Sequence, residues 1–293
     1  MELGFPGLPI RYVECPRDAW QGLGRFIPTE TKAAFLKELL AAGFRHLDLA
    51  SFVSPKRVPQ MRDAESVLAA LPPPRGRTYL AIVANEKGVR RALTARNLTA
   101  IGYPFSISET FQKKNTGRTI KESWPLVERM RAVTRGRLDL VVYLSMGFGN
   151  PYGDPWDEEA VVVFAARLRD LGVREIAVAD TYGVAGPERI HRVLARLVDA
   201  FGAEGIGAHL HSRPDPAEVR AKVDAVLDAG VRWIEGALGG VGGCPFAGDA
   251  LVGNLPTEVV LPHLVDRGYD PGPDLGRLAE LAERALWLKA RYA

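Results

Sequence analysis

The chain has 293 residues, of which 47% are hydrophobic and 25% are charged, and its formal net charge is +3. These values fit a soluble globular protein. So mild a charge gives no reason to expect a nucleic-acid partner, although it is compatible with an anionic substrate. The two cysteines, Cys15 and Cys244, are too few for a disulfide framework, so we interpret them as free thiols in a reducing compartment.

Segments for secretion and membrane insertion have recognisable patterns. The beginning of the chain shows no charged start followed by an apolar core. No stretch approaches the roughly 20 uninterrupted apolar residues of a membrane span. We therefore expect a cytoplasmic protein with no membrane association.

A helix-like segment, a glycine and a short apolar strand follow one another at residues 41–49, 170–178 and 228–235. Glycine at a helix end adopts the left-handed backbone conformation that other residues avoid. Brief apolar strands are typical of strands that are buried on both faces. The repeated succession predicts alternating strands and helices around a parallel sheet.

This alternation extends over the whole chain. Strands are predicted at residues 10–15, 45–50, 78–83, 98–102, 138–145, 175–179, 206–210 and 233–236. Helices are predicted at residues 29–42, 63–71, 87–95, 120–134, 157–171, 187–200, 216–229 and 257–267, with an additional helix at 274–292. Thr29 and Asp157 suit N-cap positions, and Pro187 and Pro216 suit a first helical turn.

Eight strands alternating with eight helices predict an α/β TIM barrel, with a doubly wound open sheet as the alternative. No linker divides the chain, so we expect residues 1–293 to form a single catalytic domain. The barrel would occupy about residues 10–268, and the additional C-terminal helix about residues 274–292. A barrel also predicts where the chemistry lies, because the loops that follow its strands meet at one face.

Polar residues follow several of the predicted strands. Arg17 and Asp18 follow the first strand, Asp48 lies late in the second, and Asp180 and Thr181 follow the sixth. Solvated strand ends would also be polar, so no one of these residues is informative alone. Their joint placement predicts an active site at the C-terminal face of the barrel.

His209 and His211 end the seventh predicted strand, where residues two apart point to the same face. They could share one cation, or they could be two unrelated polar residues of the core. Asp18 and Asn254 would complete a mixed ligand set that suits Mg²⁺ or Mn²⁺ better than Zn²⁺. The alternatives are an ion pair with Arg17 for Asp18, and a turn position for Asn254.

Cys244 lies in a glycine-rich loop, residues 239–246, after the last predicted strand. A lone cysteine is usually a buried structural residue, but this one has few side chains around it and lies at the expected active face. A thiol is mostly protonated at pH 7, so it could donate a proton to a carbanion. Once deprotonated it could act as a nucleophile. Cys244 is therefore a candidate catalytic residue.

Several motifs carry a resemblance to a known family. They are Pro16-Arg17-Asp18, Ser51-Phe52-Val53-Ser54-Pro55-Lys56, Ser108-Glu109-Thr110-Phe111, Gly149-Asn150-Pro151-Tyr152, Asp180-Thr181-Tyr182-Gly183, His209-Leu210-His211, Gly242-Gly243-Cys244-Pro245 and Gly253-Asn254. From about residue 11 to residue 268, the chain resembles 3-hydroxy-3-methylglutaryl-CoA (HMG-CoA) lyases, within the wider group of metal-dependent barrel lyases and synthases. The second and seventh motifs are typical of the lyases, whereas the Arg-Asp pair and the spaced histidines are shared with the synthases.

The resemblance implies a retro-Claisen cleavage of a 3-hydroxyacyl-CoA to acetyl-CoA and a keto acid, which is acetoacetate in the type reaction. The implied ligands of a divalent cation, Mg²⁺ or Mn²⁺, are Asp18, His209, His211 and Asn254. The resemblance further implies that His209, with Asp48 or a water molecule, takes the proton of the substrate hydroxyl. Arg17 would stabilise the enolate oxygen, and Cys244 would protonate the enolate carbon.

The chain departs from the family pattern at several positions. Ala19-Trp20 follows the aspartate in place of Gly-Leu, and a lysine that is common a few residues later is absent. Asp48 replaces a glutamate, Cys15 replaces a glycine, and Ser212-Arg213 follows the second histidine in place of Asp-Thr. These changes leave the ligand set intact, but another branched or dicarboxylic acyl-CoA stays an alternative substrate.

Two other classes of function are alternatives. A Claisen-type acyl-CoA synthase or aldolase of the same group would also use the cation and Arg17, but has no comparable need for Cys244. A non-catalytic metal-binding barrel is the other, and the complete ligand set argues against it. Four basic residues could meet the phosphates of coenzyme A or form a solvated face, namely Lys113, Lys114, Arg118 and Lys121. We expect a homo-oligomer, with a dimer favoured.

Overall fold

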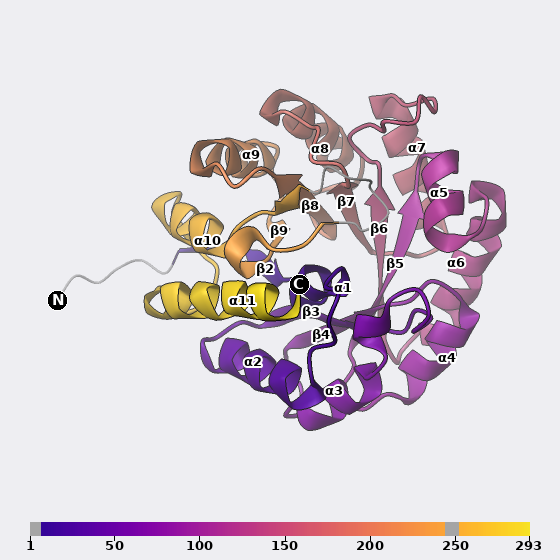
Figure 1. The fold of residues 1–293 in the computed structure, drawn as a ribbon. Helices are drawn as coiled ribbons and strands as arrows, with labels where there is room; N and C mark the ends of the chain where they lie inside the picture. Colours follow the sequence, from indigo (N-terminus) through magenta and orange to yellow (C-terminus); the bar gives the residue numbers. More distant parts are fainter. Residues whose placement is uncertain (1–6, 244–251) are drawn as a thin grey trace.

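The structure is a computed structural model that describes residues 7–243 and 252–293. In this part of the chain, eight parallel strands close into a barrel, because the last of them, β9 (Trp233–Gly236), pairs with the first, β2 (Arg11–Glu14). Helices surround the strands as an outer ring (Figure 1). The predicted α/β TIM barrel is confirmed, and the open sheet is excluded because the sheet has no free edge between β9 and β2.

The other barrel strands are β3 (His46–Ser51), β4 (Thr78–Ile82), β5 (Ala100–Ser106), β6 (Asp139–Ser145), β7 (Glu175–Asp180) and β8 (Ile206–Ser212). The helices of the described residues are α1 (Pro16–Gln21), α2 (Thr29–Ala41), α3 (Ala64–Ala70), α4 (Glu86–Thr94), α5 (Glu109–Thr116), α6 (Ile120–Thr134), α7 (Glu158–Asp170), α8 (Pro187–Phe201), α9 (Pro216–Asp228), α10 (Thr257–Asp266) and α11 (Leu278–Tyr292). Single 3-10 turns are η1 (Pro59–Met61), η2 (Leu238–Gly240) and η3 (Leu275–Arg277).

Two short strand pairs supplement the barrel. β1 (Leu8–Pro9) pairs in parallel with β11 (Tyr269–Asp270), which ties the beginning of the chain to the segment after α10. β10 (Gly253–Asn254) pairs in antiparallel fashion with the end of β8. The additional C-terminal helix is present as α11, which lies between α10 and α2 in Figure 1. Its last turn is joined to the loop after α1, since the Arg25 N–H donates to the Tyr292 carbonyl at 2.9 Å.

Every predicted strand and helix has a counterpart, and two helices were not predicted. These are α1 and α5, which are only 6 and 8 residues long and show no clear helical period. The predicted first-turn positions of Pro187 and Pro216 are confirmed. So is the N-cap Asp157, whose carboxylate accepts a hydrogen bond from the Ala160 N–H at 2.7 Å.

The prediction that Thr29 caps α2 is wrong. The N-cap of this helix is Pro28, and Thr29 is its first helical residue. The Thr29 hydroxyl instead donates a 2.8 Å hydrogen bond to Asp63. The Thr29 side chain, which could have capped α2, therefore makes a tertiary hydrogen bond to the residue before α3.

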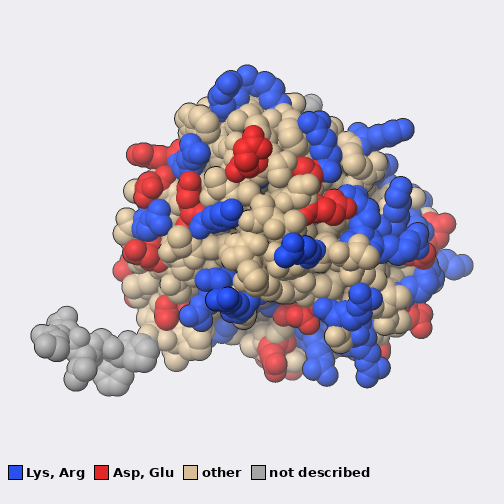
Figure 2. Space-filling model, turned by 90° about the horizontal axis from the view of Figure 1, so that it is seen from below, with Lys and Arg blue, Asp and Glu red and all other residues tan. Residues whose placement is uncertain are grey.

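The outside of the barrel carries charges of both signs. Figure 2 shows both basic and acidic side chains on one face, and the two signs are nearly balanced over the chain, with a net charge of +3. Most residues of the barrel strands are buried, and every residue of β8 is. Among the described residues, no helix is both long enough and apolar enough to cross a bilayer.

Candidate active site

Three separate segments supply the side chains predicted to bind a cation. Asp18 lies on α1, which begins two residues after β2 ends. His209 and His211 lie on β8 and share a face of the strand because they are two residues apart. Asn254 lies on β10 rather than in a turn, and the antiparallel register places it directly opposite His211.

These segments bring the predicted ligands together. Ligand atoms of Asp18, His209 and His211 lie within 4.8 Å of one another, and all three residues are buried. The two imidazole rings have centroids 5.1 Å apart. Asn254 adjoins the group, because its side-chain amide donates a 2.8 Å hydrogen bond to Asp18 Oδ2. We call these four residues the ligand cluster.

The atoms of the cluster fit a divalent cation. His209 Nδ1 is 2.8 Å from Glu235 Oε2, and His211 Nδ1 is 3.2 Å from the Thr181 carbonyl oxygen. These partners favour the tautomer that carries its proton on Nδ1 and keeps the lone pair of Nε2. Within the described residues, His211 Nε2 and Asn254 Oδ1 are buried without a hydrogen-bond partner. Unpaired buried acceptors are costly, and a cation bound between them would satisfy both.

Two of the ligands already have the protonation state that a cation needs. Burial alone raises the pKa of Asp18, but the Arg17 guanidinium beside it lowers this pKa to about 2. Burial and the neighbouring His209 lower the pKa of His211 to about 4. Burial also lowers the pKa of His209, but the hydrogen bond and charge of Glu235 outweigh this and raise it. An ionised carboxylate and a neutral imidazole are the forms that bind metals.

Arg17 is fixed beside the cluster by two carboxylates. Its Nη1 donates to Asp18 Oδ1 at 2.9 Å, its Nε donates to Asp48 Oδ2 at 3.0 Å, and its Nη2 also pairs with Asp48. The ion pair with Asp18, predicted as an alternative to metal ligation, therefore coexists with the cluster. Burial raises the pKa of Asp48 to about 6, although the charge of Arg17 opposes this. A buried guanidinium held in this way can stabilise negative charge that develops next to it.

A cavity of about 240 Å³ is lined by Arg17 and by three residues of the ligand cluster, Asp18, His209 and His211. Polar side chains at the ends of β3 and β6 and in the segments after β3, β4 and β5 also line it, among them Ser51, Ser145, Arg57, Asn85 and Asn115. Ser51 and Ser145 are the last residues of their strands. The cavity therefore lies at the C-terminal face, where a TIM barrel carries its active site.

Gly242 allows the backbone to pass close to the cluster. Its φ is +116°, and an added Cβ would lie 2.4 Å from Asn254 Nδ2 and 3.0 Å from Asp18 Oδ2. The Gly243 N–H is 3.4 Å from the same Asp18 oxygen. Cys244, the predicted proton donor, follows in the sequence and lies outside the described residues.

The side chains of Asp180 and Thr181, two further polar residues predicted at a strand end, bind backbone groups of nearby loops and do not belong to the ligand cluster. The Asp180 carboxylate accepts hydrogen bonds from the N–H groups of Val184 and Ala185 at 3.1 and 3.0 Å. The Thr181 hydroxyl accepts one from the Met146 N–H at 3.1 Å. Both side chains thus brace the loops that follow β6 and β7.

Sequence reasoning missed Gln21 and Glu235. Gln21 donates a 2.7 Å hydrogen bond to Asp18 Oδ1, and one helical turn separates the two residues on α1. Because α1 was not predicted, this pair was not visible. Glu235 could have been noticed, because a carboxylate within an apolar buried strand requires partners.

The closed barrel and the ligand cluster at its C-terminal mouth define the class: a TIM-barrel enzyme with a candidate metal site. A family model described as HMGL-like matches residues 13–284. This match covers most of the chain, and the chain belongs to the HMGL-like family.

Known relatives are similar over nearly their whole length. The chain is 31% identical over 277 residues to a hydroxymethylglutaryl-CoA lyase of Bacillus subtilis, which covers 94% of this chain and 90% of that protein. It is 30% identical over 277 residues to a 3-hydroxy-3-isohexenylglutaryl-CoA/hydroxymethylglutaryl-CoA lyase of Pseudomonas aeruginosa, with 94% and 91% covered. A solved HMG-CoA lyase of Acinetobacter baumannii, in complex with coenzyme A and 3-methylmalate, superposes with a TM-score of 0.90 at 28% identity, with 96% and 92% covered.

Proposed function

We propose that this chain is a metal-dependent carbon–carbon lyase. It cleaves HMG-CoA, or a close 3-hydroxyacyl-CoA, to acetyl-CoA and acetoacetate or the matching keto acid. Membership of the HMGL-like family and the lyase activities named for its relatives support the reaction. The complex of a similar lyase with coenzyme A supports an acyl-CoA as the substrate.

One observation carries the proposal: the ligand cluster converges beside a buried guanidinium at the mouth of the barrel. Retro-Claisen cleavage removes the proton of the C3 hydroxyl and breaks the C2–C3 bond. The electron pair of that bond becomes the enolate of acetyl-CoA, which must then gain a proton on carbon. The site therefore needs a proton acceptor, a stabiliser of the enolate oxygen and a proton donor.

A divalent cation held by Asp18, His209, His211 and Asn254 would orient the substrate oxygens and lower the pKa of the hydroxyl. Arg17 is proposed to stabilise the enolate oxygen, because its charge is fixed and permanent. Asp48 is proposed to hold Arg17 in place, since both carboxylate oxygens of Asp48 accept from the guanidinium. Cys244 is proposed to protonate the enolate carbon.

His209 has two proposed roles, cation ligand and proton acceptor, and both require Nε2. Its Nδ1 is already 2.8 Å from Glu235. One lone pair cannot serve both roles at the same moment. A water molecule in the cavity is therefore the alternative acceptor of the hydroxyl proton.

The test is an assay for acetyl-CoA release from a panel of 3-hydroxyacyl-CoAs, with and without Mg²⁺ or Mn²⁺. The panel should include the methylglutaryl and isohexenylglutaryl substrates that the relatives' names specify. We expect release of acetyl-CoA with at least one glutaryl-type substrate, and loss of release when the protein is stripped of metal. No release with any member of the panel, in the presence of either ion, would refute the proposal.

We further propose that the native ion is Mg²⁺ or Mn²⁺, because carboxylate, amide and imidazole ligands without a thiolate suit these ions. Residues 1–293 are proposed to act as one catalytic domain, in a homodimer and in the cytoplasm. Metal analysis of the purified protein, its mass in solution and fractionation of the source cells test these points.

A further inference from the structure

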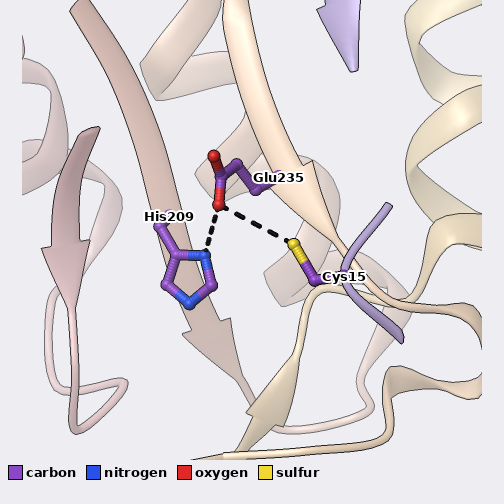
Figure 3. Close-up of side chains that lie close together, drawn as sticks. All are labelled: Cys15, His209 and Glu235. Carbon is purple, nitrogen blue, oxygen red and sulfur yellow. Dashed lines mark hydrogen bonds and ion pairs between the residues drawn. The ribbon is translucent and has the colours of Figure 1, made fainter. Parts of the chain in front are cut away.

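Glu235 is a buried carboxylate for which the proposed reaction gives no role. It is 1% exposed and lies on β9, inside the barrel. Its Oε2 is 2.8 Å from His209 Nδ1 and 3.7 Å from the Cys15 Sγ (Figure 3). Its Oε1 accepts hydrogen bonds from the Trp233 indole at 3.1 Å and the Tyr143 hydroxyl at 3.2 Å.

The four neighbours fix what each oxygen of Glu235 can do. The indole N–H of Trp233 can only donate, so Oε1 must accept. A carboxylate also accepts at its other oxygen, so His209 must carry a proton on Nδ1. The lone pair of His209 is then on Nε2, the ring atom that Glu235 does not engage. Figure 3 shows Glu235 and Cys15 together on one side of the imidazole ring.

We propose that Glu235 is a positioning residue that holds His209 in the tautomer and orientation that present Nε2 to the cation. This inference rests on the proposed metal site. Carboxylates that accept the second N–H of a ligating histidine act in this way in other metal sites, where their loss typically weakens metal affinity about 10–100-fold. Tyr143, Trp233 and Cys15 hold Glu235 in turn, so the support of the ligand extends to β6, to β9 and to the residue between β2 and α1.

A second metal site is the competing interpretation, since ligand atoms of Cys15, His209 and Glu235 also lie within 4.8 Å of one another. Two observations favour hydrogen bonding instead. Both oxygens of Glu235 are already engaged by donors. Burial and the nearby Glu235 charge raise the pKa of the Cys15 thiol well above its usual range, so the thiol remains a donor and not a metal-binding thiolate.

Glu235→Gln and Glu235→Asp separate positioning from packing. Glutamine preserves the shape but has one acceptor, which the Trp233 indole requires. Its N–H₂ group then faces His209 Nδ1, so the imidazole proton must move to Nε2 and block ligation. Aspartate is one methylene shorter but still accepts at both oxygens. A positioning role predicts that aspartate is the milder change, whereas a packing role predicts the opposite.

The first readout is the affinity of the metal-free protein for Mn²⁺, measured by titration calorimetry. We expect one ion per chain in the wild type, 10–100-fold weaker binding in Glu235→Gln, and binding closer to wild type in Glu235→Asp. The matched control is Glu175→Gln, which removes a carboxylate paired with Arg11 at the start of β7. This control should bind Mn²⁺ as the wild type does.

The second readout is the histidine tautomer, measured by long-range ¹H–¹⁵N spectra of the Mg²⁺-loaded, ¹⁵N-histidine-labelled protein. We expect the His209 proton on Nδ1 in the wild type and on Nε2 in Glu235→Gln. Unchanged Mn²⁺ affinity together with an unchanged tautomer in Glu235→Gln would overturn the positioning role of Glu235 but not the proposed function. Two ions per chain, with one lost in Cys15→Ala, would also overturn it. If the wild type binds no Mn²⁺, the proposed function itself fails.

Discussion

Each of the two histidines of the ligand cluster is oriented by a hydrogen-bond partner at its Nδ1 atom. Glu235 engages Nδ1 of His209, and the Thr181 carbonyl engages Nδ1 of His211, so both Nε2 atoms are available to the proposed cation. Neither partner belongs to the His-Leu-His motif. At this scale, the chemistry of the site therefore depends on residues that orient the ligands as well as on the ligands themselves.

Gly242 should be essential for cation binding, because a Cβ there would lie 2.4 Å from Asn254 Nδ2 and 3.0 Å from Asp18 Oδ2. We expect Gly242→Ala to weaken Mn²⁺ binding at least 10-fold, by displacing these ligands, as loss of ligand support does in other metal sites. Titration calorimetry measures this. Gly76→Ala is the control, since Gly76 also has a positive φ, +82°, but has no atom within 4 Å of the added Cβ. Equal effects of the two substitutions would mean that backbone strain, and not the contact, is responsible.

Cys244→Ala should retain the cation and lose most of the turnover. A general acid typically contributes about 10²–10⁴-fold to the rate, so we expect kcat to fall by that factor. Mn²⁺ affinity should stay at the wild-type value, because the thiol is not a proposed ligand. The measurements are the acetyl-CoA release assay and calorimetry on the same preparation. Turnover near that of the wild type would remove the thiol from the mechanism.

Short elements position Arg17 and two of the four residues of the ligand cluster. The six-residue helix α1 carries Arg17 and Asp18, and the two-residue strand β10 places Asn254 opposite His211 through its pairing with β8. The longer helices contribute mainly to stability. Helices such as α6 cover the barrel and supply stability, and their ends are marked by local hydrogen bonds.

The capping box of α6 provides a test of that local stability. The Thr119 hydroxyl accepts from the Glu122 N–H at 3.1 Å, and the Glu122 carboxylate accepts from the Thr119 N–H at 2.8 Å. Thr119→Ala should cost about 1 kcal/mol and lower Tm by about 2 °C, whereas Thr119→Ser keeps the acceptor and should cost less. Differential scanning calorimetry compares the variants. Identical Tm values for alanine and serine would show that the cap contributes nothing.

Closure of the barrel buries a carboxylate that links the first barrel strand to the segments that follow the last one. Glu14 on β2 accepts hydrogen bonds from the Leu238 N–H at 2.8 Å and from the Thr257 hydroxyl at 2.5 Å. Burial raises the pKa of Glu14 to about 8, from the usual 4.5 of a glutamate side chain. The folded protein therefore holds this proton more tightly than the unfolded chain does.

This difference predicts how stability changes with pH. The contribution of Glu14 is complete below pH 4.5, declines as the pH rises, and is fully lost above about pH 8. The slope is at most about 1.4 kcal/mol per pH unit. Glu14→Gln resembles the protonated acid, so its Tm relative to the wild type should rise between pH 5 and pH 8. A Tm difference that stays constant over this range would contradict the prediction.

The sequence by itself determined the alternation of strands and helices, the barrel and the shared face of His209 and His211. These features follow from local patterns: the period of apolar residues, the glycines at helix ends, and the spacing of two within a strand. The ends of α6, for example, coincide with the predicted range 120–134. The predicted ligands could be named because their residue types suit a hard cation.

Only the tertiary structure decided which side chains from distant parts of the sequence are in contact. Asp18 and Asn254 are 236 residues apart in sequence, and they touch because β9 pairs with β2 and β10 returns along β8. The same closure places Cys15 beside Glu235, and the pairing of β8 with β9 places Glu235 opposite His209. Local patterns indicate which face of a helix or strand is buried, but they contain no information about the side chains that pack against that face. That is why the contacts that support the ligand cluster were not predictable from the sequence, whereas α1 and β10 are too short to show a period of apolar residues.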